Sequence, residues 1–97
     1  MPAARGRKTH GSDVMVVEDV NEVVRVRADF AGPVVTPRAF KRKGRVYAIT
    51  RVNAAWEDRE GAFAKYHFSV EAEGNVYEVH LDSRDMSWRL DRVCMEG

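Results

Sequence analysis

The feature that most constrains the fold of this 97-residue chain is an alternation of apolar and polar residues with a period of two. It is clearest in the segment 22–30, EVVRVRADF. One face of this segment would contain Val24, Val26, Ala28 and Phe30. The segments 65–72, 76–82 and 86–93 alternate in the same way. Because successive side chains of a strand point to opposite faces, these segments are expected to be half-buried β-strands.

The remaining segments are less regular. Residues 14–20 are expected to form a short strand that pairs with 22–30 through a turn near residues 18–21. Pro33 and Pro37 lack amide donors and fix the dihedral φ, so residues 31–39 are predicted to be a loop. Residues 53–64, NAAWEDREGAFA, are polar and contain Gly61, and we expect a long hairpin loop with one helical turn near residues 54–60.

Five or six strands with short connections and no strong amphipathic helix predict an all-β fold. We expect an antiparallel meander that is curled or closed as a small barrel, and the alternative is a sheet with one short helix packed on it. The length allows one domain, which we assign to residues 13–97. Residues 1–12 mix small and basic residues without apolar periodicity and are predicted to be a flexible basic tail.

The hairpin formed by segments 65–72 and 76–82 needs a loop of even length, because an odd loop would place the two apolar sets on opposite faces. A Glu73-Gly74 turn sets His67 opposite His80. A turn at Gly74 and the following asparagine fits a type II′ geometry and sets His67 opposite Asp82. Both registers are compatible with the sequence.

Composition indicates a globular protein of a reducing compartment. Apolar residues make up 44% of the chain and charged residues 32%, and no apolar run approaches the roughly 20 residues that span a bilayer. The N-terminal residues lack the apolar stretch of a secretory signal. Cys94 is the only cysteine, which excludes an internal disulfide. We therefore expect a cytoplasmic protein without a membrane partner.

Charge is distributed unevenly along the chain. Residues 30–56 include six basic residues and no acid, whereas residues 57–97 include five basic residues and ten acids. Such a basic segment can bind the phosphates of nucleic acid, or it can be the solvated edge of a strand. The candidate nucleic-acid-binding residues are Lys41, Arg42, Lys43, Arg45, Tyr47 and Arg51.

The orientation of Tyr47 separates two interpretations of this segment. If Tyr47 points outward between Arg45 and Arg51, it is a platform on which single-stranded bases can stack. If it fills the core, the two arginines emerge at the rims and only phosphate contacts remain. Gly44 predicts a tight turn with Lys43 at its tip in either case.

The sequence contains no recognisable catalytic signature, and we expect no enzymatic activity and no cofactor. His67 and His80 across a hairpin could hold a divalent ion, but catalytic zinc sites use three protein ligands. We therefore expect two solvated polar side chains and no metal. Cys94 has no histidine or asparagine at a recognisable spacing that would make it a nucleophile.

Several aromatic and turn residues occur in an order that resembles a known family. The pattern P-x-x-F-x-x-x-G-x-x-Y begins at Pro37, and Trp56, Tyr77 and a W-x-L motif at Trp88 follow. Over roughly residues 34–93 this resembles a small bacterial domain of unknown function. Some members stand alone, and others are appended to catalytically inactive relatives of Y-family DNA polymerases. Members usually have a tryptophan where this chain has Arg42. The family has no assigned activity that could be transferred, so the resemblance implies only a DNA-repair context for some relatives.

Two functions therefore follow from the sequence. The first is a non-enzymatic accessory module that contacts nucleic acid through the basic segment 38–51. The alternative is a protein-interaction or homo-oligomerisation domain that uses a sheet edge or an aromatic patch around Trp56 and Trp88.

Overall fold

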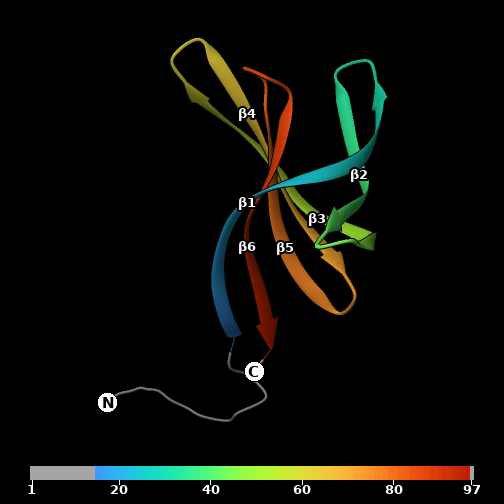
Figure 1. Ribbon diagram of the computed structural model, residues 1–97. Helices are drawn as coiled ribbons and strands as arrows, with labels where there is room; N and C mark the ends of the chain where they lie inside the picture. The colour runs from blue at the N-terminus through green and yellow to red at the C-terminus, as the bar shows by residue number, and fades with distance from the viewer. Residues whose placement is uncertain (1–14, 97) are drawn as a thin grey trace, which may run out of the picture.

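The computed structural model describes residues 15–96, which form six antiparallel strands closed into a barrel (Figure 1). The strands are β1 (Met15–Ala31), β2 (Val34–Arg42), β3 (Arg45–Glu60), β4 (Phe63–Ala72), β5 (Asn75–Asp82) and β6 (Ser87–Glu96). Each strand pairs with the next, and β6 pairs with β1. The predicted all-β antiparallel meander is confirmed. It is closed as a barrel and is not an open curled sheet. The predicted tail, residues 1–12, lies outside the described residues.

Tight turns join the strands, and two of them are two-residue turns with positive φ at both positions. These are Lys43-Gly44, with φ of 52° and 78°, and Glu73-Gly74, with φ of 54° and 81°. Such angles are typical of type I′ turns, whose twist matches that of the flanking strands. The second turn decides the register of the β4–β5 hairpin. His67 lies opposite His80, and the register that places it opposite Asp82 is wrong.

The two predicted loops and the predicted helical turn are wrong, because strands occupy both segments. β2 begins at Val34, and Pro37 is buried within it. The ladder between β1 and β2 shifts register beside the partner of Pro37, Ala28, and strand prolines are found at such irregularities. β3 continues to Glu60 and pairs with β4 as far as Phe63. Residues 15–96 contain no helix, and therefore none that is long and apolar enough to cross a membrane.

β1 is one strand of 17 residues instead of two strands joined by a turn near residues 18–21. At the expected turn the chain makes a bulge. Asn21 has a φ of 52°, and the register with β6 shifts between Asp19 and Glu22. The positive φ bends the strand without ending it, so both halves of β1 pair with β6 or β2.

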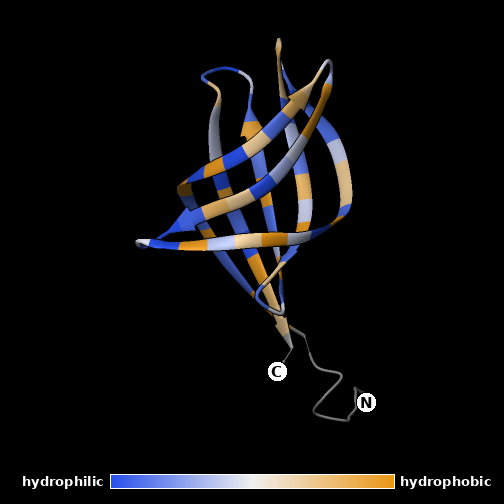
Figure 2. Ribbon diagram, turned by 90° about the vertical axis from the view of Figure 1, so that its right-hand side faces the viewer, coloured by the Kyte–Doolittle hydropathy of each residue, from blue (hydrophilic) through white to orange (hydrophobic). Residues whose placement is uncertain are grey.

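Alternation places the core on one side of each strand, and Figure 2 shows hydrophobic and hydrophilic residues following one another along the ribbons. The buried cluster consists of Val24, Phe40, Phe68, Val70, Ala72, Tyr77, Val79, Leu81, Trp88, Leu90 and Val93. The expected inward faces of β4 and β5 are confirmed, as is that of β6 at Trp88 and Leu90, whereas Met86 lies in the turn before β6 and is 58% exposed. Phe30 is an exception. It is 57% exposed, because it lies beside the β1–β2 turn at one end of the barrel.

β6 departs from strict alternation at one point. Leu90 and Val93 are both buried although they are three positions apart. The register with β5 shifts here, so that Val79 pairs with Leu90 and Glu78 with Arg92. Asp91 is the extra residue of this β-bulge. The bulge turns both Asp91 and Arg92 away from the core and toward the outer surface of the barrel.

Candidate functional site

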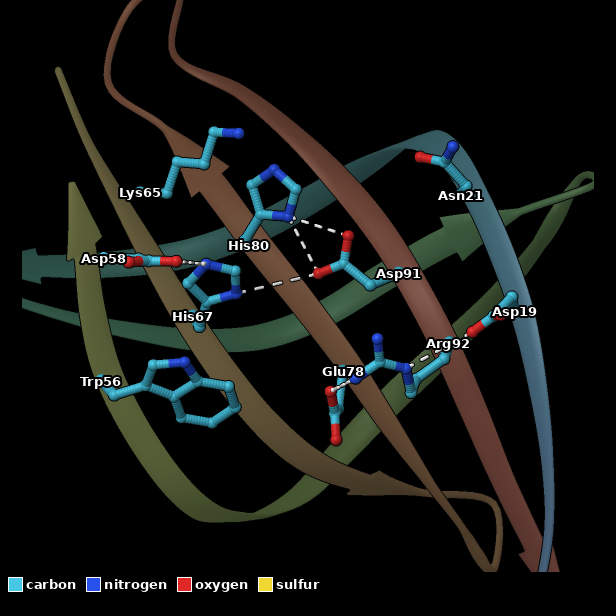
Figure 3. Close-up of a pocket in the computed structure, with 10 residues that line it drawn as sticks. All are labelled: Asp19, Asn21, Trp56, Asp58, Lys65, His67, Glu78, His80, Asp91 and Arg92. Atoms are coloured by element: carbon cyan, nitrogen blue, oxygen red, sulfur yellow. Dashed lines mark hydrogen bonds and ion pairs between the residues drawn. The ribbon is translucent and has the colours of Figure 1, made fainter. Parts of the chain in front are cut away.

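A hollow on the surface lies over β1 and β3 to β6, on the side of the sheet opposite the core (Figure 3). It has a volume of about 570 Å³. Its lining residues are Asp19, Asn21, Trp56, Asp58, Lys65, His67, Glu78, His80, Asp91 and Arg92. Trp56, His67 and His80 are successive cross-strand partners and form one row, and Asp91, the bulge residue of β6, reaches His80 from the next strand. We call this the histidine hollow.

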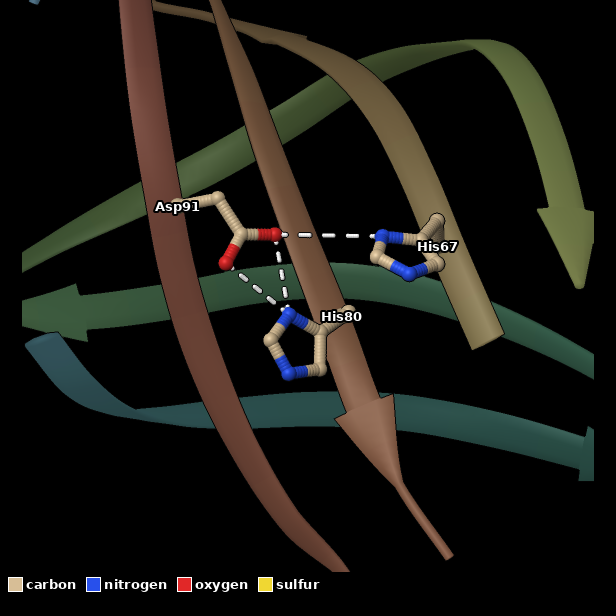
Figure 4. Close-up of side chains that lie close together, drawn as sticks. All are labelled: His67, His80 and Asp91. Carbon is tan, nitrogen blue, oxygen red and sulfur yellow. Dashed lines mark hydrogen bonds and ion pairs between the residues drawn. The ribbon is translucent and has the colours of Figure 1, made fainter. Parts of the chain in front are cut away.

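Two imidazole rings and one carboxylate meet at the centre of the histidine hollow (Figure 4). His80 Nδ1 lies 2.9 Å from both carboxylate oxygens of Asp91. His67 Nδ1 lies 3.9 Å from Asp91 Oδ2. The two rings have centroids 5.0 Å apart. Asp91 therefore faces the Nδ1 atoms of both histidines, and it does so because of the bulge in β6.

Neither histidine is the solvated side chain that the sequence predicted. His80 is only 8% exposed, and the side chain of His67 is 18% exposed. Burial lowers the pKa of His67 below its ordinary value, and the neighbouring His80 lowers this pKa further. His67 is therefore neutral at pH 7 and has a free lone pair on one ring nitrogen.

The Nε2 atom of His67 has no hydrogen-bond partner within residues 15–96. His67 Nε2 is buried and makes no hydrogen bond within the described chain. The nearest carboxylate oxygen, Asp58 Oδ2, is 4.0 Å away on a side chain that is 72% exposed. Trp56 covers the imidazole face, with ring centroids 5.3 Å apart and an interplanar angle of 6°. The stacking fixes the orientation of the His67 ring.

The cations at the rim of the histidine hollow are paired with carboxylates. Arg92 lies 2.6 Å from Glu78 and 3.5 Å from Asp19, and Lys65 lies 2.9 Å from Glu60. These pairs neutralise the positive charge around the rim. The histidine hollow is consequently not suited to a phosphate.

The basic segment is less free in the fold than in the sequence, because β1 and the β4–β5 turn supply acids. Arg42 pairs with Glu22 at 2.6 Å, and Arg38 pairs with Asp29 at 2.7 Å. Arg45 pairs with Glu73. The predicted acid-free surface therefore does not form at these three arginines.

Other cations of this region have no carboxylate partner within residues 15–96 and gather around a second, smaller hollow of about 270 Å³. It is lined by Arg25, Val26, Arg27, Ala39, Phe40, Lys41 and Val46, and we call it the basic hollow. Arg25 lies directly opposite Lys41 in the β1–β2 ladder. Arg25 and Arg27 are not among the residues predicted from the sequence, although their outward positions in the alternating segment 22–30 were the available signal.

The remaining basic candidates lie apart from this hollow or at its margin. Lys43 is exposed at the tip of the β2–β3 turn. Arg51 is on β3 opposite Glu71 and does not line the basic hollow. Lys41 is thus the one predicted residue that lines it.

Tyr47 belongs to the core side of β3. Its ring is stacked on Phe40, with centroids 4.9 Å apart, and lies 5.8 Å from that of Tyr77. The guanidinium carbon of Arg45 is 5.0 Å from the centroid of the Tyr47 ring. Both faces of the tyrosine are therefore in use, and the interpretation of Tyr47 as a stacking platform for bases is wrong.

The two tryptophans do not form a shared surface patch. Trp88 is 9% exposed and packs against Phe68, with centroids 5.8 Å apart. Trp56 is 44% exposed on the opposite side of the sheet, where it covers His67. The expected partner surface made of both residues is therefore wrong, and only Trp56 is accessible.

Comparison of this chain with protein-family models, with curated proteins and with solved structures gives no match.

Proposed function

We propose that this protein is a non-enzymatic accessory module that contacts the phosphates of nucleic acid through the basic hollow. One observation supports the proposal above others. Arg25, Arg27 and Lys41 surround one hollow, and they form no ion pair with any carboxylate of residues 15–96. Lys43, at the nearby β2–β3 turn, adds a fourth exposed cation.

Contacts of this kind bind without reading sequence. Cations on a rigid sheet neutralise phosphate charge and release condensed counterions, and this supplies affinity that falls with salt. Because Tyr47 stacks within the core, base stacking does not contribute at this position. The expected ligand is therefore a duplex or a single strand, held by its backbone.

The wider setting remains a prediction from the sequence. The resemblance to a bacterial domain found beside polymerase relatives would place the module in DNA repair. The single thiol, Cys94, agrees with a cytoplasmic location.

A salt titration with a labelled DNA duplex tests the proposal. Three phosphate contacts predict that the logarithm of the binding constant falls with the logarithm of salt concentration at a slope of about −2.7. The triple variant Arg25→Gln, Arg27→Gln, Lys41→Gln should lose most of this slope.

The matched control is the triple variant Arg38→Gln, Arg59→Gln, Arg84→Gln. It removes the same formal charge from arginines that already pair with carboxylates, so binding should remain close to wild type. Absence of binding by the wild type at low salt contradicts the proposal. An equal loss in both variants contradicts the role of the basic hollow.

A second candidate function is self-association through β3. All residues from Arg51 to Glu60 are exposed, and the β2–β3 ladder ends at Ala48, so this part of β3 has a strand neighbour on one side only. A second copy of the chain could pair with that edge. Sedimentation velocity at increasing concentration should then show a dimer that Val52→Asp dissociates. A monomer at every concentration rejects this function.

A further inference from the structure

The histidine hollow is not used by the proposed function, and its chemistry is distinct. We infer that His67, His80 and Asp91 form a binding site for a divalent transition-metal ion, with Zn²⁺ as the reference ion. The three residues come from β4, β5 and β6, and each offers one ligand atom. Two imidazole nitrogens and one carboxylate are a donor set that such ions accept.

The distances allow coordination after small side-chain movements. The three ligand atoms lie within 4.8 Å of one another. A metal bonded to two ligand atoms at about 2.1 Å each holds them at most about 4.2 Å apart. The separations to the Asp91 carboxylate, 2.9 Å from His80 and 3.9 Å from His67, already fall below this limit. The third edge of the triangle, at most 4.8 Å long, needs to shorten by about 0.6 Å, which small shifts of the three side chains can supply without turning the stacked His67 ring.

The hydrogen-bonding state of the two rings agrees with this arrangement. On metal binding, the ion takes the place of the hydrogen between His80 Nδ1 and Asp91, and the imidazole hydrogen resides on Nε2. His67 Nδ1 faces the same carboxylate without reaching hydrogen-bond distance. A metal between the three groups therefore uses a contact that the protein alone leaves unformed.

An independent observation comes from the far side of His67. A histidine that binds a metal usually donates its other N–H to a carboxylate, which fixes the tautomer. His67 Nε2 is buried without a hydrogen-bond partner in residues 15–96, and Asp58 Oδ2 lies 4.0 Å from it. Because Asp58 is exposed and free to rotate, it can close this distance. Trp56 holds the ring plane that both contacts need.

The bulge in β6 also supports a metal site at this position. Without the extra residue, β6 would place a single outward side chain between Leu90 and the next buried position. With it, Asp91 faces the histidines while Arg92 separately reaches Glu78. Bulges occur next to functional sites because they redirect a side chain in this way.

The donor set also indicates which ions the site would select. Mg²⁺ and Ca²⁺ prefer shells made of oxygen, so two imidazoles disfavour them. Three protein ligands leave one or more positions of the ion open, and the surrounding hollow has room for water or a small ligand there. The site is therefore of the open kind, in contrast to closed structural zinc sites.

Isothermal titration of chelator-treated protein with ZnCl₂, followed by Co²⁺ absorption spectroscopy, tests the inference. We expect one ion per chain and a Co²⁺ spectrum of low coordination number. Asp91→Asn and His67→Gln should each weaken Zn²⁺ binding at least about 100-fold, and Asp58→Asn about 10-fold, because its contact is indirect. Circular dichroism confirms that each variant is folded.

Matched controls remove other potential ligands. His10→Gln removes the remaining histidine, and Cys94→Ser the single thiol, and both should bind Zn²⁺ as the wild type does. The imidazole NMR signals of His67 and His80 should shift with Zn²⁺ while those of His10 do not. Failure of the wild type to bind, or binding that is lost with His10→Gln and retained with Asp91→Asn, overturns the inference. The basic-hollow triple variant should keep its Zn²⁺ affinity, so this result is separable from nucleic-acid binding.

Discussion

At the scale of single residues, the same amino acid has different physical roles on the two sides of this sheet. Trp88 fills the core against Phe68, whereas Trp56 lies outside and covers an imidazole. Burial of an aromatic ring removes a large apolar surface from water, while a half-exposed ring mainly positions its neighbour. The contribution of each tryptophan to stability should differ accordingly.

Replacement of each tryptophan by alanine measures this difference. Trp88→Ala should lower the free energy of unfolding by about 3–5 kcal/mol, because it leaves a cavity in the core. Trp56→Ala should cost about 1 kcal/mol, since the ring is 44% exposed. Urea unfolding followed by circular dichroism gives both values. Equal costs would show that the two rings have similar environments.

Asp85 provides a prediction about pH at the same scale. Its Oδ1 accepts hydrogen bonds from the Ser87 hydroxyl at 2.7 Å and from the Ser87 backbone N–H at 3.0 Å. These bonds, led by that of the hydroxyl, lower the pKa of Asp85 below its ordinary value of 3.8. The stabilisation is present above pH 3.8 and is lost as the pH falls through the lowered pKa.

Ser87→Ala should therefore raise the pKa of Asp85 toward 3.8 and weaken the loss of stability in this acidic window. An NMR titration of the side-chain carboxyl measures the pKa directly. The pKa of Glu60, which is lowered mainly by its hydrogen bond to Lys65, is the internal control and should not change. An unchanged Asp85 pKa would contradict the assigned cause.

At the scale of strands, alternation predicted the inward faces of β4, β5 and β6 because a period of two is visible within each segment without knowledge of its partner strands. It did not predict that residues 31–39 and 53–60 are strands. Pro37 and the polar run before Gly61 are local signals for a loop. Both segments are nevertheless strands, because β1 pairs with the first and β4 with the second. Strand pairing of this kind is not visible in a single segment.

The same limit applies to the candidate sites. Counting charges along the sequence could not show that Glu22 approaches the basic segment from β1 and Glu73 from the β4–β5 turn. Asp91, the third residue beside His67 and His80, could not be predicted from alternation because it lies in the bulge of β6. The spacing of three between buried Leu90 and Val93, which breaks the period of two, was the available signal for it.

Unequal pairing of the strands predicts unequal local stability. β5 has a partner strand along both sides and is largely buried, whereas residues 53–60 of β3 are exposed and paired with β4 only. Amide hydrogens of β5 should therefore exchange with solvent far more slowly than those of residues 53–60. Hydrogen–deuterium exchange followed by NMR tests this. Similar rates in both strands would contradict it.

At the scale of the whole molecule, each strand of the barrel pairs with the next strand in sequence, and the pairing of β1 with β6 closes the ring. β1 and β6 join over a long ladder that begins with Met15 opposite Glu96. The two ends of the described chain therefore lie side by side (Figure 1). By contrast, β2 and β3 are joined by four residue pairs, from Ala39 and Ala48 to the turn.

Circular permutation tests this closure. A chain that begins at Ala62, ends at Gly61 and uses residues 97 and 1–14 as the new connection should fold to the same barrel, because only a surface turn is opened. Its far-UV spectrum should match that of the wild type. A permutant opened between Val79 and His80, in the middle of buried β5, is the control and should not fold. Loss of structure in the first permutant would contradict the ring.

Closure between the first and last strands also has a consequence for biosynthesis. β1 leaves the ribosome first of the six strands, but its long ladder partner β6 leaves last. A nascent or prematurely terminated chain that lacks β6 would expose unpaired backbone along β1 and β5, and such edges recruit other chains. Translation products that stop before β6 should therefore aggregate or be degraded, whereas a chain that includes β6 covers both edges in a single step.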